Sequence, residues 1–131
     1  MLAADLPCVL GHADFEAQNL RWRRDGRVEA VHDWDSPAWQ PEAALVGAAC
    51  GAFASASPPS LAPVESSAAF LEAYQDHRGR GFTAREREVA WAASLWPAAH
   101  NARWEAVHGT SPVCGRAVRA QAAERLRRAN A

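Results

Sequence analysis

Strand-forming segments are confined to the first third of this 131-residue chain, and from Pro41 onward the sequence has the character of helix. The apolar segment 8–10, followed by a glycine, is typical of a short buried strand that leads into a loop. Two further segments, 20–23 and 28–32, flank an Asp-Gly pair of the kind favoured in tight hairpin turns. The chain is long enough for one domain, and we expect a mainly α fold of the α+β type with a small β-hairpin.

The helical remainder, residues 41–129, is expected to begin near Pro41, because proline is tolerated at the first helical position. This first helix runs toward Phe53. A connector rich in serine and proline, 55–63, separates it from a second helix over 64–79, where apolar residues recur at helical spacing.

A third helix is expected to start at Thr83, since Thr83 and Glu86 have the spacing of a capping box. Its end is predicted at Gly109, and Pro97 should kink it or divide it into two helices, because proline lacks a backbone donor and its ring collides with the preceding turn. A last amphipathic helix covers about 115–128.

Composition narrows the class of partner. The formal net charge of −1 supplies no chain-wide positive field for nucleic acid, so none is expected as a partner. No apolar run approaches the length of a membrane helix, and no signal peptide is recognisable, which favours a cytoplasmic protein with no membrane partner. Cys8, Cys50 and Cys114 are far apart and form no C-x-x-C pair, so we expect reduced, mostly buried thiols.

Side chains suited to phosphoryl transfer gather in segment 11–19 and, after the expected hairpin, in segment 32–35. Phosphoryl transfer needs a carboxylate that orients and deprotonates the acceptor hydroxyl, and hard oxygen ligands that keep magnesium on the phosphates. The spacing H-x-D-x-x-x-x-N, then a hairpin, then a further Asp supplies these groups. The hairpin should return the second segment to the side of the first.

This pattern resembles the catalytic and metal-binding loops of the phosphotransferase family that includes aminoglycoside, homoserine and choline kinases, distant relatives of protein kinases. The resemblance implies that Asp14 is the catalytic base and that His12 supports the loop. Asn19 and Asp33 match the two residues that bind magnesium. The activity implied is ATP-dependent transfer of phosphate to a hydroxyl group of a small molecule, with Mg²⁺ and ATP as cofactors.

The resemblance also implies an organisation for the chain, a single domain over 1–131 that corresponds to the C-terminal lobe of a protein-kinase-like fold. Its parts would be a catalytic loop at 11–19, a hairpin at 20–32, a metal-binding loop at 33–35 and the helical remainder at 41–129. Leu20 and His32 would contact the adenine side of the site. The family usually has an apolar residue where this chain has His32.

The chain differs from the family in the part that binds the nucleotide. In the kinase fold a glycine-rich loop, a strand lysine and its partner glutamate precede the catalytic loop. Here the motif begins at residue 12, no G-x-G-x-x-G occurs, and all 14 basic residues are arginine. We therefore expect the N-terminal nucleotide lobe to be absent, binding of ATP and Mg²⁺ by this chain to be weak or absent, and phosphate transfer by the chain alone to be negligible.

One alternative is a non-catalytic remnant or interaction module of the same fold. Without a covering lobe, apolar side chains beside the hairpin, including Leu20, Trp22 and Val31, would be exposed. A homodimer or a separate N-terminal lobe would then cover them.

A second alternative assigns His12, Asp14, His32 and Asp33 to a hydrolytic zinc or iron centre, because imidazole and carboxylate groups suit these metals. This hypothesis leaves Asn19 without a role.

The remaining aromatic, acidic and imidazole side chains have simpler explanations. Tryptophans at helical spacing belong mostly to the core, which is the expectation for Trp22, Trp39, Trp91, Trp96 and Trp104. Solvated helix charges are favoured over an acidic wall for a cationic aminoglycoside at Glu42, Glu65, Glu72 and Asp76. Exposed or hydrogen-bonded rings are expected for His77, His100 and His108.

Overall fold

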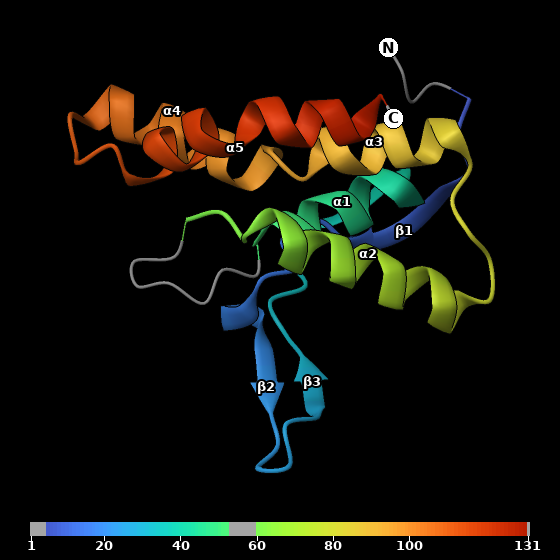
Figure 1. Ribbon diagram of the computed structural model, residues 1–131. Helices are drawn as coiled ribbons and strands as arrows, with labels where there is room; N and C mark the ends of the chain where they lie inside the picture. The colour runs from blue at the N-terminus through green and yellow to red at the C-terminus, as the bar shows by residue number, and fades with distance from the viewer. Residues whose placement is uncertain (1–4, 53–59, 131) are drawn as a thin grey trace.

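Two separate two-stranded sheets are formed by the first part of the chain. The computed structural model describes residues 5–52 and 60–130. Strands β1 (Cys8–His12) and β4 (Pro37–Pro41) pair antiparallel, as do β2 (Leu20–Trp22) and β3 (Val28–Val31). The β2–β3 hairpin extends away from the helices, whereas β1 lies against them (Figure 1). A hairpin is therefore present where the Asp-Gly pair predicts it.

Helices make up most of the described chain, so the expected mainly α, α+β class is correct. Their bounds are α1 Glu42–Ala52, α2 Val64–Arg78, α3 Ala84–Ala93, α4 Trp96–His108 and α5 Val113–Ala129. Helix α1 lies centrally, with α2 on one side and α3, α4 and α5 on the other (Figure 1). Among the helices in the described ranges, none has the length and apolar character needed to cross a membrane.

Helices α1 and α3 approach so closely that α1 carries glycine at the points of contact. A Cβ atom placed on Gly47 would lie 2.2 Å from the Ala90 carbonyl oxygen, and one placed on Gly51 would lie 1.9 Å from that of Ser94. Both distances are far below van der Waals contact. This pair of helices forms the centre of the core, where Val46, Val89 and Trp91 are buried.

A buried arginine joins α5 to the rest of the helical layer. The Arg125 side chain is fully buried and donates to the Ser94 hydroxyl at 2.8 Å and the Ser67 hydroxyl at 3.1 Å. It also donates to the Ala62 carbonyl and to the Gln121 amide oxygen. All these acceptors are neutral, and burial lowers the pKa of the guanidinium.

The helix ends follow the expected chemistry. Thr83 and Glu86 form the predicted capping box at the start of α3. Arg80 donates to Glu86 at 2.7 and 2.9 Å, and this pairing, against the opposing effect of burial, lowers the pKa of Glu86 to about 2. Gly79 and Gly109, which follow α2 and α4, have left-handed φ angles of 73° and 66°.

The helix expected from Thr83 is divided in two, which is one of the two arrangements that Pro97 predicts. Pro97 lies in the first turn of α4, where a missing backbone donor costs nothing. Two expected boundaries need correction. Helix α1 starts at Glu42, because Pro41 is still paired to Cys8 as the last residue of β4. Helix α5 begins at Val113. Phe53 and most of the predicted connector at 55–63 lie outside the described residues.

The expectation that the tryptophans are core residues is wrong for four of five. Trp91 is buried, whereas Trp22, Trp39, Trp96 and Trp104 are 51%, 70%, 63% and 53% exposed. Trp22 and Trp39 lie in two-stranded sheets, which bury few side chains, and the other two lie on an outer face of α4. Helical spacing shows that aromatic side chains share a face but not which way that face points.

Candidate active site

The candidate site begins where strand β1 ends at His12. The pairing of His12 with Pro37 closes the β1–β4 ladder, and one residue further the Ala13 N–H donates to the Ser36 carbonyl at 3.0 Å. The loop that follows therefore leaves the sheet beside the segment that leads into β4. The sequence predicted the loop from residue 11, but Gly11 and His12 are still strand.

His12 is buried and connects the two predicted loops. Its Nε2 lies 3.0 Å from the His32 carbonyl oxygen, and its Nδ1 lies 3.2 Å from the Asp14 backbone N–H. A neutral ring with its proton on Nε2 satisfies both contacts, by donating to the carbonyl and accepting from the amide. The rings of Phe15 and Trp34 pack edge-on against the imidazole, with centroids at 6.1 and 4.8 Å. His12 therefore joins the loop after β1 to the segment that precedes Asp33.

Asn19 is buried and holds Asp14 in place. Its Nδ2 donates to the Asp14 backbone carbonyl at 2.8 Å and to the Asp14 carboxylate Oδ2 at 3.0 Å. Its backbone N–H donates to the Glu16 carbonyl at 3.0 Å, and its carbonyl accepts from the His32 N–H at 3.0 Å. The structure thus brings Asp14 and Asn19 into direct contact.

Asp33 follows directly after the residue that bonds to both His12 and Asn19. The His32 backbone is held to Asn19 through its N–H and to His12 through its carbonyl, so the Asp33 backbone lies next to these contacts. Asp33 has a φ of 65°, in the left-handed region that aspartate tolerates better than most residues. Non-glycine residues held in this region are frequent at functional sites. Its side chain is exposed.

The donor groups suit magnesium better than zinc. Because both N–H groups of the Asn19 amide point to Asp14, the Asn19 Oδ1 is the atom left for a ligand, and Asp33 adds a carboxylate. Both ring nitrogens of His12 are occupied by backbone contacts, which argues against the zinc or iron hypothesis. Across residues 5–52 and 60–130, no group of three or more His, Cys, Asp or Glu is arranged to hold a metal ion.

A cavity of about 610 Å³ opens beside Asp14. The loops contribute Ala13, Asp14, Glu16, Gln18 and Ser36, and helix α4 contributes Trp96, Pro97, His100 and Asn101. Sequence reasoning did not assign the α4 residues to the site. They lie some eighty residues away along the chain, and no motif connects them to the loop.

The two residues expected on the adenine side differ in exposure. Leu20 is buried, whereas the His32 side chain is exposed. Of the three apolar residues expected to be exposed beside the hairpin, only Trp22 is exposed. Val31 is half-buried, and the expectation is wrong for Leu20, which is buried.

Two of the acidic residues considered for an acidic wall are engaged in ion pairs. Glu42 is buried, accepts from the Tyr74 hydroxyl at 2.5 Å and pairs with Arg78. Burial, together with the Glu42 carboxylate, raises the pKa of Tyr74 to about 12. Glu65 accepts from Arg128.

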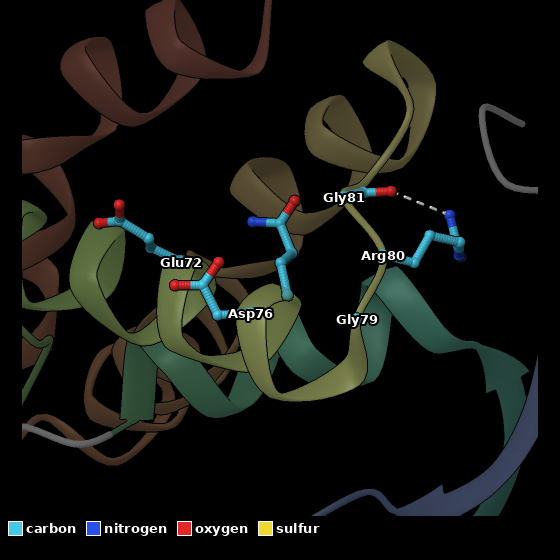
Figure 2. Close-up of a pocket in the computed structure, with 6 residues that line it drawn as sticks. Glu72, Asp76, Gly79, Arg80 and Gly81 are labelled. Carbon is cyan, nitrogen blue, oxygen red and sulfur yellow. Dashed lines mark hydrogen bonds between the residues drawn. The ribbon is translucent and has the colours of Figure 1, made fainter.

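The other two, Glu72 and Asp76, lie on α2 and line a separate hollow of about 330 Å³ (Figure 2). Gln75, Gly79, Arg80 and Gly81 complete this hollow, and Arg80 donates to the Gly81 carbonyl at 3.1 Å. None of these residues lines the cavity beside Asp14.

Comparisons with protein-family models, with curated proteins and with solved structures found no match to this chain.

Proposed function

We propose that this chain is the catalytic part of a magnesium-dependent phosphotransferase, resembling the C-terminal lobe of a kinase, that moves phosphate from ATP to a hydroxyl group of a small molecule. The observation that carries the proposal is the bond from the Asn19 amide to the Asp14 carboxylate, in a loop that His12 joins to the segment before Asp33. These contacts of two buried side chains, His12 and Asn19, support the assignment of the motif.

Asp14 is the group that would take the proton of the acceptor hydroxyl. Asn19 occupies its Oδ2 at 3.0 Å, so Oδ1 is the atom that would accept from the hydroxyl. Asp14 lines the cavity beside α4, which gives the acceptor a place to bind. The two bonds from Asn19 fix the orientation of the loop before substrate arrives, which lowers the entropic cost of reaching the reactive geometry.

Asn19 and Asp33 are the residues that would hold magnesium. When bound, Mg²⁺ would neutralise the negative charge that phosphate transfer concentrates on the oxygens. The left-handed φ of Asp33 takes the backbone out of the extended path of β3, and the His32 contacts hold the residue before this turn. These 131 residues include no lysine and no glycine-rich loop. The chain should therefore bind the nucleotide with low affinity.

The partner proposed for the hairpin is a second copy of the chain or a separate nucleotide-binding lobe. A two-stranded hairpin is marginally stable alone in water. Here it exposes Trp22 and Val28, at 51% and 44%, on strands that contact few other residues.

A titration with Mg²⁺·ADP tests the proposed function. In ¹⁵N-resolved NMR spectra, millimolar Mg²⁺·ADP should shift the backbone amides of 11–19 and 32–35. Asp33→Asn retains a residue that tolerates the left-handed conformation but removes the charge, so the affinity should fall at least about tenfold, or about 1.4 kcal/mol.

Asp25→Asn is the matched control, because Asp25 is an exposed carboxylate in the hairpin turn. Its affinity for Mg²⁺·ADP should equal that of the unmodified chain. Equal affinity in the Asp33→Asn chain, or shifts that do not require Mg²⁺, would contradict the proposal.

A further inference from the structure

The α4 side of the cavity carries a large exposed aromatic side chain. Trp96 is 63% exposed and lines the cavity that also contains Asp14. The His100 ring, one turn along α4, lies 5.8 Å from the indole at an angle of 45°. An exposed indole next to a cavity offers a ligand more apolar area to cover than most side chains do.

Helix α4 is held firmly, so Trp96 is positioned before a ligand binds. Ala98, two residues further, is fully buried in the small core that α4 shares with Cys114 of α5. At the other end, the Glu105 carboxylate accepts from the N–H groups of Cys114 and Gly115 at 2.7 and 3.0 Å. These two N–H groups lower the pKa of Glu105, so the contact is made by the charged form.

Apart from Ala13 and Pro97, the remaining residues that line the cavity are polar, and two of them are acidic. They include the carboxylates of Asp14 and Glu16, and no arginine among the described residues lines the cavity. Gln18, Ser36 and Asn101 supply amide and hydroxyl groups. An anionic ligand would be repelled by the two carboxylates, whereas a neutral or cationic ligand with several hydroxyl groups would find partners.

We propose that Trp96 is the specificity-determining residue of this cavity and that the ligand is a saturated ring bearing several hydroxyl groups. One face of the ring lies on the Trp96 indole, where weakly positive C–H groups meet the electron-rich aromatic face. The polar edge of the ring faces Asp14 and Asn101. The further step, in which one hydroxyl group of the ring accepts phosphate, rests on the proposed function. Binding of the ring does not require phosphate transfer.

Three pyranoses with the same ring and different charge test the inference: glucosamine, glucose and glucuronate. Each is titrated into the full chain while the indole N–H signals are followed by ¹⁵N NMR, the Trp96 signal being assigned as the one lost in Trp96→Phe. Glucosamine and glucose should shift the Trp96 signal, and glucuronate should bind at least about tenfold more weakly than glucosamine.

Trp96→Ala should weaken the binding of glucosamine at least about fivefold, and Trp96→Phe should restore part of it. Trp104→Ala is the matched control, because Trp104 is also exposed on α4, stacks on His108 at 4.3 Å and does not line the cavity. It should bind like the unmodified chain. Equal affinity in Trp96→Ala, equally strong binding of glucuronate, or no shift of the Trp96 signal would overturn the inference.

The outcome separates this inference from the proposed function. In one outcome, the ring binds at Trp96 while Asp33→Asn leaves the affinity for Mg²⁺·ADP unchanged. That result would support the cavity as a ring-binding site and reject the proposed phosphotransfer site. Binding of Mg²⁺·ADP that depends on Asp33, with no effect of Trp96→Ala on the pyranoses, would reject the role of Trp96 alone.

Discussion

Replacing Arg125 by alanine should destabilise the fold by about 3–5 kcal/mol, a large part of the total stability of a domain, which is usually about 5–15 kcal/mol. The guanidinium is fully buried and joins Ala62, Ser67 and Ser94 to helix α5. Truncation opens a cavity at the junction of three helices. It also leaves the Ala62 carbonyl without its donor, and an unsatisfied buried polar group costs about 1–3 kcal/mol.

Urea unfolding followed by circular dichroism measures this effect, with two variants for comparison. Arg125→Met fills most of the space, so its loss should be smaller than that of the alanine variant. Arg116→Ala removes an exposed arginine from the same helix and should change stability by less than about 0.5 kcal/mol. A loss in Arg125→Ala no larger than in Arg116→Ala would show that the arginine does not hold the helices together.

Gly47→Ala should destabilise the chain by about 3 kcal/mol, although alanine is the better helix former by about 1 kcal/mol. The new methyl group would lie 2.2 Å from the Ala90 carbonyl oxygen, which belongs to the backbone of a neighbouring helix and cannot rotate away. The two helices at the centre of the core would have to separate. A lower midpoint of thermal unfolding measures the loss.

Gly115→Ala is the control, and its expected change in stability has the opposite sign. Gly115 lies in the first turn of α5, where an added Cβ would make only ordinary contacts of 3.6 Å or more. This variant should gain up to about 1 kcal/mol from helix propensity. If Gly47→Ala were also stabilising, the close approach of α1 and α3 would be wrong.

Local chemistry made several elements predictable. The capping box at Thr83, the glycine after α2 and the Asp-Gly turn each act over a few residues, so the sequence alone marks them. Strand β4 was missed because Pro37 and Pro41 suggest a break, and only its pairing with β1 makes the segment a strand. The exposure of Trp39 follows from that unforeseen sheet.

The loop side of the candidate site could also be predicted, because its residues are close in sequence and a hairpin between them has a defined reach. The contacts of His12 with His32 and of Asn19 with Asp14 agree with that geometry. The α4 side could not be predicted. Trp96 reaches the cavity only through the packing of α4 against α1 and α5, and a helical pattern does not specify such packing.

The most direct test of the central claim is to locate the metal with Mn²⁺, which prefers the same oxygen ligands as Mg²⁺ and broadens the NMR signals of nearby nuclei. With Mn²⁺ at a small fraction of the chain and ADP in excess, the amide signals of Asn19, Asp33 and Trp34 should broaden first. Gly26, at the far end of the hairpin, should remain sharp, and Asp33→Asn should abolish the broadening at Asn19. Broadening centred on Glu72 and Asp76, or broadening at Asn19 that persists in Asp33→Asn, would contradict the account.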